Sequence, residues 1–128
     1  MAKGVFHAEL SSNTHQLNVQ LELYKFKEDN YYIMYCPALD LSTSGKSEAE
    51  AEESFSETFQ IYINYCINKR TLVEDLQKNG WDVRSMKQRK MKAPDTKKLL
   101  RINETLQDIV FNRDYEKTSR SVEIPQLV

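Results

Sequence analysis

Glycine and proline are scarce in this sequence, with three of each among 128 residues. This scarcity argues against extensive disorder. The formal net charge is −1, so the whole molecule has no electrostatic drive toward nucleic acid or anionic membranes. No apolar stretch approaches the roughly 20 residues that a membrane-spanning helix needs, and the N-terminus lacks the apolar core of a signal peptide. We therefore predict a single cytoplasmic domain that makes no membrane contact.

Cysteine is also rare, and the two that occur, Cys36 and Cys66, form no Cys-x-x-Cys pair. Both lie in apolar stretches, which is typical of buried thiols in a reducing compartment. The alternative is a metal site shared with His7 or His15, and the spacing does not favour it. Phosphate-binding glycine loops and nucleophile motifs are missing from the sequence. We predict no catalytic residue, no metal site and no cofactor.

Three strands are expected in the first third of the chain. Apolar residues alternate with polar ones between Leu17 and Leu23, which is the pattern of a half-buried strand. Tyr24 and Phe26 break the phase and predict a bulge or flare at the strand end. A turn at 27–30 would lead into a second strand, Tyr31 to Cys36, as a hairpin. Pro37 interrupts pairing, and a short third strand would end at Gly45.

A long amphipathic helix is the clearest element. Ser47 and Glu50 form a capping box, and further acids occupy the first turns, where the helix dipole favours them. One apolar stripe follows the helix: Ala51, Phe55, Phe59, Tyr62, Ile63, Cys66 and Ile67. A second capping box, Thr71 to Glu74, predicts a short helix that ends at Asn79–Gly80, with Trp81 folding back onto the core.

The remainder of the chain is strongly basic between Arg84 and Arg101. Leu99 to Phe111 fits one helix, and Ser121 to Ile124 fits a late strand. We divide the chain into a flexible leader (1–14), a core (15–83) and a basic C-terminal extension (84–128), which could return a late strand to the sheet or to a dimer. The predicted fold class is α+β: a small, mainly antiparallel sheet covered by one long helix, plus a short second helix and the extension.

The order strand, strand, short strand, helix over about residues 17–70 resembles the HicB antitoxin family. The resemblance is carried by Tyr35 to Asp40 (YCPALD), Gly45 to Ser47 (GKS) and Glu48 to Tyr62. It implies a trimmed ribonuclease H fold and a partner, a small basic RNA-cleaving toxin of the HicA type. Lys46 and Ser47 stand where the family usually has an acidic residue and threonine. Many members also bind operator DNA through a C-terminal motif, and no such motif is recognisable after Trp81.

Two sets of charged residues are candidate binding sites. Acidic side chains could contact a basic toxin or form an ordinary solvated face, and the candidates are Asp40, Glu50, Glu53 and Glu57. Basic side chains could contact nucleic acid, pack against the acidic helix or form a solvated tether, and they are Arg84, Lys87, Arg89, Lys90 and Lys92.

The leading hypothesis is a non-enzymatic, antitoxin-like binding protein. The alternatives are a nucleic-acid-binding regulator that uses the basic segment and a stand-alone HicB-like protein with another protein partner. A magnesium nuclease built from Glu22, Asp40 and the helix acids is kept only as a check. An exposed edge strand, expected in an open sheet, favours a homo-oligomer.

Overall fold

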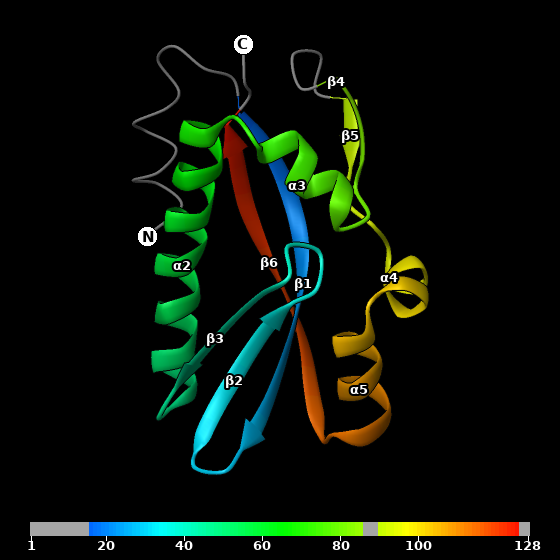
Figure 1. Ribbon diagram of the computed structural model, residues 1–128. Coiled ribbons are helices and arrows are strands. Elements are labelled where there is room, and N and C mark those ends of the chain that lie inside the picture. Colours follow the sequence, from blue (N-terminus) through cyan, green and yellow to red (C-terminus); the bar gives the residue numbers. More distant parts are fainter. Residues whose placement is uncertain (1–15, 86–89, 126–128) are drawn as a thin grey trace.

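The computed structural model describes residues 16–85 and 90–125. Its centre is an antiparallel sheet of four strands in the order β3-β2-β1-β6 (Figure 1). The strands are β1 (Gln16–Glu28), β2 (Tyr31–Cys36), β3 (Leu41–Gly45) and β6 (Tyr115–Pro125). The α+β class, the hairpin and the short third strand are thereby confirmed. The predicted leader, 1–14, lies outside the described residues.

One face of the sheet is covered by the long helix α2 (Glu48–Lys69). The predicted apolar stripe faces inward, with Phe55, Phe59 and Ile63 packed in one cluster with Leu21 and Leu23 of β1. Ser47 caps the helix, because its Oγ accepts a hydrogen bond from the Glu50 N–H at 3.1 Å. The chain can pass from β3 into α2 only because residue 45 is glycine, since a Cβ there would lie 2.5 Å from the backbone nitrogen of Ala51.

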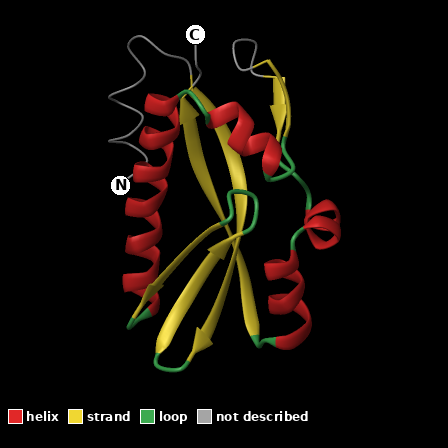
Figure 2. Ribbon diagram, viewed as in Figure 1, coloured by secondary structure: helices red, strands yellow, loops and turns green. Residues whose placement is uncertain are grey.

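The opposite face of the sheet is also covered, by α4 (Thr96–Ile102) and α5 (Glu104–Asn112), so helices flank the strands on both sides (Figure 2). Tyr24 and Phe26 point to this second face and are buried with Leu106 and Ile109. β1 pairs with both neighbours in unbroken register through this region. The predicted bulge or flare is therefore wrong. The phase break marks the point where the second face becomes apolar.

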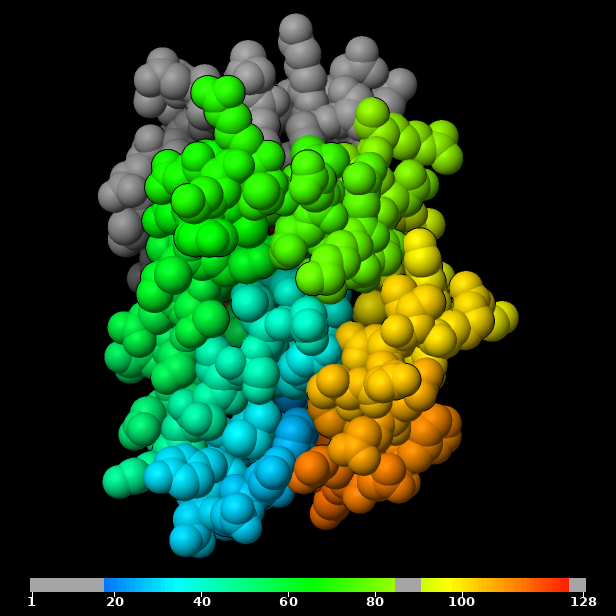
Figure 3. Space-filling model, viewed as in Figure 1, coloured from blue at the N-terminus to red at the C-terminus, as the bar shows by residue number. Residues whose placement is uncertain are grey.

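The single helix predicted over Leu99–Phe111 is in fact two helices. Asn103 has an extended backbone between them, with φ −116° and ψ 105°, which no continuous α-helix allows. Its side chain accepts a hydrogen bond from the Leu106 N–H at 2.8 Å and thereby caps α5. The space-filling view shows the segment that forms α4 and α5, in yellow and orange, against the blue and cyan strands (Figure 3).

The late strand is longer than predicted and belongs to the central sheet. β6 pairs antiparallel with β1 from Gln16↔Pro125 to Phe26↔Tyr115. Lys25 ties this pair to α2, because its Nζ lies 3.2 Å from Glu116, 3.4 Å from Glu48 and 3.7 Å from Glu52. The C-terminal segment therefore returns a strand to the sheet, which was one of the two expected arrangements.

The segment between α2 and α4 closes the end of the core. The short helix α3 (Leu72–Lys78) forms as predicted, but the side chain of Thr71 makes no capping hydrogen bond, so the second capping box is wrong. Trp81 folds back as predicted: it is buried, and its Nε1 donates to the carbonyl oxygen of Ala38 at 2.7 Å. A hairpin of β4 (Asp82–Ser85) and β5 (Lys90–Lys92) follows.

No helix in the described ranges is long and apolar enough to cross a membrane.

Candidate functional site

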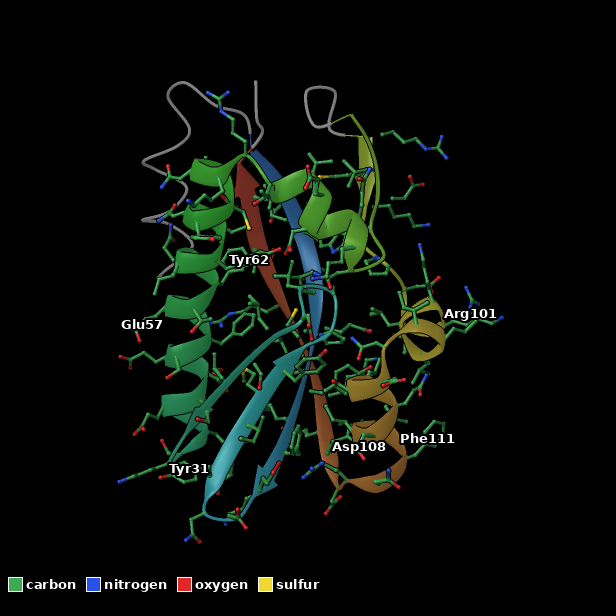
Figure 4. All side chains as sticks on the ribbon, viewed as in Figure 1. Tyr31, Glu57, Tyr62, Arg101, Asp108 and Phe111 are labelled. Atoms are coloured by element: carbon green, nitrogen blue, oxygen red, sulfur yellow. The ribbon has the colours of Figure 1, made fainter. Side chains whose placement is uncertain are left out.

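The acidic residues of α2 divide into two groups. Glu48 and Glu52 turn toward Lys25 and share its ammonium with Glu116. Glu53 and Glu57 are exposed, and neither forms an ion pair with any described residue. Figure 4 shows Glu57 on the side of α2 that points away from the sheet. The free acidic charge of the helix therefore faces solvent.

Glu50, also a predicted contact residue, has a local structural role. Its N–H donates to Ser47, and its carboxylate Oε1 accepts from the backbone N–H of Lys46 at 3.3 Å. This pairing differs from an ideal capping box only in that the carboxylate reaches Lys46 instead of Ser47. Glu50 is exposed and precedes Glu53 by three residues and Glu57 by seven, so it lies on the same outer side of α2.

Asp40 does not join the acidic residues of the helix. It lies in the loop that precedes β3, whereas α2 begins after the other end of β3 (Figure 1). Its backbone is left-handed, with φ 53°. Its Oδ1 accepts a hydrogen bond from the Tyr35 hydroxyl at 2.7 Å, and Asn103 Nδ2 donates to the same hydroxyl oxygen at 2.9 Å. Asp40 therefore links the β2–β3 loop to the start of α5.

The outer side of α2 also carries two exposed apolar residues that the sequence pattern did not single out. Ile61 is 68% exposed and Tyr65 is 60% exposed. Ile61 follows Glu57 by one turn and Tyr65 follows Ile61 by another, so the side chains form one continuous strip. We call Glu53, Glu57, Ile61 and Tyr65 the α2 outer strip. The sequence contained one sign of this strip, because Ile61 and Tyr65 are apolar yet fall outside the helical period of the buried stripe.

The basic candidates do not gather into a described surface. Arg84 is exposed on β4 and lies 3.5 Å from Asp82, which offsets its charge. Lys92 is exposed at the end of β5. Lys87 and Arg89 lie outside the described residues, and only the backbone of Lys90 is described, within β5. The structure therefore leaves this candidate site without a defined geometry.

The carboxylates considered for a metal site lie apart and form other contacts: Glu22 pairs with Lys117, and Asp40 accepts a hydrogen bond from Tyr35. Within the described ranges, no three His, Cys, Asp or Glu side chains come together in a way that could hold a metal ion. Glu22 lies on the sheet face covered by α4 and α5, where Lys117 Nζ is 2.8 Å from its Oε2 and the Thr96 hydroxyl donates to its Oε1. Burial raises the pKa of the Cys36 thiol to about 12, so this thiol stays protonated.

The Glu22–Lys117 pair makes stability depend on pH in a defined direction. Burial raises the pKa of Glu22, but the hydrogen bonds from Lys117 and Thr96 outweigh it, and the pKa lies below its ordinary value of 4.5. The pair therefore stabilises the fold above that value and loses its contribution as the pH falls through the lowered pKa.

Glu22→Gln is expected to lower the free energy of unfolding at neutral pH by less than about 1 kcal/mol, because the pair is partly exposed. The deficit should shrink in acid, measured by urea unfolding at several pH values. Glu53→Gln is the control, since it removes a carboxylate that has no ion pair. A deficit that stays constant down to strongly acidic pH would contradict the assigned role of the pair.

Comparisons with protein-family models, with curated proteins and with solved structures found no match to this chain.

Proposed function

We propose that this protein is a non-enzymatic, cytoplasmic binding protein of the antitoxin kind, which masks a small basic RNA-cleaving protein. The proposal is supported by the order of elements over residues 17–70, where three antiparallel strands lead into one long covering helix. That order, with the YCPALD and GKS segments, is the basis of the resemblance to HicB antitoxins. The binding surface in this proposal is the α2 outer strip.

The strip combines two properties that a basic partner would recognise. Glu53 and Glu57 present charge that no described cation neutralises, and such charge accelerates the encounter with a positive surface. Ile61 and Tyr65 present apolar area next to that charge. A few anchor residues supply most of the affinity in protein interfaces, and tyrosine is enriched among them. This juxtaposition on one helix side is the observation that carries the proposal.

The helix that bears the strip is held rigidly. Its inner side contributes Phe55, Phe59 and Ile63 to the main core, and Lys25 anchors its first turns. Its C-terminal half is linked to α3, where the Tyr62 hydroxyl donates to the carboxylate of Asp75. A partner would therefore meet side chains on a backbone that is already ordered, which lowers the entropic cost of binding.

Neutralising the charge of the strip should weaken binding to such a partner. The probe is a small basic protein with a Gly-Ser-His element, to be sought among the genes that neighbour this one. A neighbourhood without such a gene would contradict the proposal. We expect Glu53→Gln/Glu57→Gln to raise the Kd about tenfold at low salt, mainly by slowing association, with a smaller effect at high salt. Isothermal titration calorimetry and stopped-flow mixing measure both quantities.

The matched control is Glu74→Gln/Glu104→Gln, which removes two exposed acids of α3 and α5. Each double variant raises the formal net charge from −1 to +1, so a general charge effect would appear in both. An equal loss of affinity in the two variants, or no binding by the wild type, contradicts the proposal. Salt-sensitive binding to duplex DNA that Lys87, Arg89 and Lys90 control would favour the regulator instead.

A further inference from the structure

The central sheet ends in the long strand β6, and no second described strand pairs with its outer side. β6 has 11 residues and pairs with β1 along its whole length. No other described strand pairs with β6, because it stands last in the strand order. The other edge strand, β3, has only five residues. An edge strand of this length exposes a row of backbone N–H and C=O groups that can template a further strand.

We propose that β6 pairs antiparallel with β6 of a second copy of this chain, with Thr118 on the twofold axis. The two sheets would then join into one. In this register Glu116 of each copy lies directly opposite Arg120 of the other, twice per dimer, and Lys117 lies opposite Ser119. Opposite charges at directly opposed positions stabilise a strand pair, whereas like charges destabilise it.

The charges of β6 select this register over its neighbours. An axis at Lys117 would place two lysines face to face, and an axis at Arg120 would do the same with two arginines. An axis at Ser119 would oppose Glu116 to Val122 and leave the carboxylate without a charged partner. The axis at Thr118 opposes each Glu116 to an arginine and brings no like charges together. The charged residues that usually discourage edge pairing are therefore self-complementary here.

The surroundings of Glu116 and Arg120 agree with this arrangement. Both side chains lie on the sheet face that α2 covers, since Glu116 reaches Lys25 and the Arg120 guanidinium lies 5.6 Å from the centre of the Phe55 ring. No described carboxylate forms an ion pair with Arg120. Glu116 is 72% exposed and can accept further hydrogen bonds beside that of Lys25. Each side chain thus retains capacity for a partner across the axis.

This contact leaves the α2 outer strip uncovered and does not depend on the proposed function. Its test needs only the purified full chain, in sedimentation equilibrium and in size-exclusion chromatography with light scattering. The wild type is expected to dimerise as its concentration rises. Glu116→Arg and Arg120→Glu should each be monomeric, because each places like charges opposite one another. Mixing these two variants should restore a dimer, since every opposed pair then becomes Arg–Glu again.

A cross-link tests the axis itself. Residues directly opposed in an antiparallel pair have Cα atoms about 4.5–5.5 Å apart, which a disulfide can span. Thr118→Cys should therefore form a covalent dimer under mild oxidation, and the native Cys36 and Cys66 are buried. Ser121→Cys is the control, because it would lie about 20 Å from its counterpart. A monomeric wild type, a failure of the mixed variants to pair, or equal cross-linking at 118 and 121 overturns the proposal.

Discussion

Replacing Phe55 by alanine is expected to lower the free energy of unfolding by about 3–5 kcal/mol, the range for truncating a buried aromatic side chain. Phe55 is 1% exposed and lies in the main cluster with residues of β1, β2 and α3. Its ring stacks on that of Phe59, with the two ring centroids 6.4 Å apart. It also makes a cation–π contact with the Arg120 guanidinium. The loss therefore combines a cavity with broken contacts on both the helix and β6. Urea unfolding followed by circular dichroism measures it.

Phe111→Ala is the matched control, because it makes the same chemical change on a side chain that is 76% exposed (Figure 4). We expect this substitution to change the free energy of unfolding by no more than about 0.5 kcal/mol. Both variants replace phenylalanine by alanine in a helix, so the difference between the two losses reports the burial of Phe55 and not the helix propensities of the two residue types. Similar losses at the two positions would mean that α2 does not pack on the sheet through Phe55.

Gly45→Ala is expected to cost about 3 kcal/mol, at the upper end of the usual range for an overpacked site. The added Cβ would lie 2.5 Å from Ala51 N and 2.8 Å from Glu50 C. Both are backbone atoms of the first turns of α2, which cannot swing away as a flexible side chain could. The substitution must therefore shift the helix from β3. Thermal and urea unfolding measure the loss.

Gly80→Ala provides the comparison for that result. Gly80 has φ +99°, which strains an L residue, but the nearest atom to an added Cβ is the flexible end of Ile102 at 3.0 Å. We expect a loss of about 1–2 kcal/mol from backbone strain, without displacement of α2. A Gly45→Ala protein as stable as the wild type would contradict the close approach of α2 to β3.

The covered face of α2 could be predicted because its signals are local. Helical periodicity identified Phe55, Phe59 and Ile63 as inward, and Ser47 supplied the N-cap. The second covered face could not be predicted in the same way. Alternation in β1 identified one apolar face, and Tyr24 and Phe26 were interpreted as an irregularity because nothing local indicates that α5 packs there. That packing depends on contacts between residues about 80 apart in sequence.

Local sequence patterns gave wrong predictions at two helix boundaries. Leu99, Ile102, Leu106 and Ile109 fit one helical period, and the break at Asn103 is stabilised by a hydrogen bond to Tyr35, which is distant in sequence. Thr71 matched a capping pattern, yet its side chain does not cap α3. In both places tertiary context overrides the local preference.

The candidate site was predicted in part. The helical pattern placed the acids on α2. It could not show that Lys25 forms ion pairs with Glu48 and Glu52, whereas Glu53 and Glu57 form none with a described residue. Asp40 was grouped with these acids by charge alone, whereas the chain holds it at the far end of β3. Ile61 and Tyr65 lie outside the helical period of the buried stripe, so the sequence indicated that they are not core residues. That both are exposed was established only by the packing of α2 on the sheet.

The measurement that tests the binding surface most directly is the mapping of backbone amide shifts by nuclear magnetic resonance as the basic partner is added. We predict that the largest changes fall along α2 at Glu53, Glu57, Ile61 and Tyr65, while α4 and α5 change little. Changes concentrated on α4, α5 or the β4–β5 hairpin, with α2 unaffected, would contradict the account.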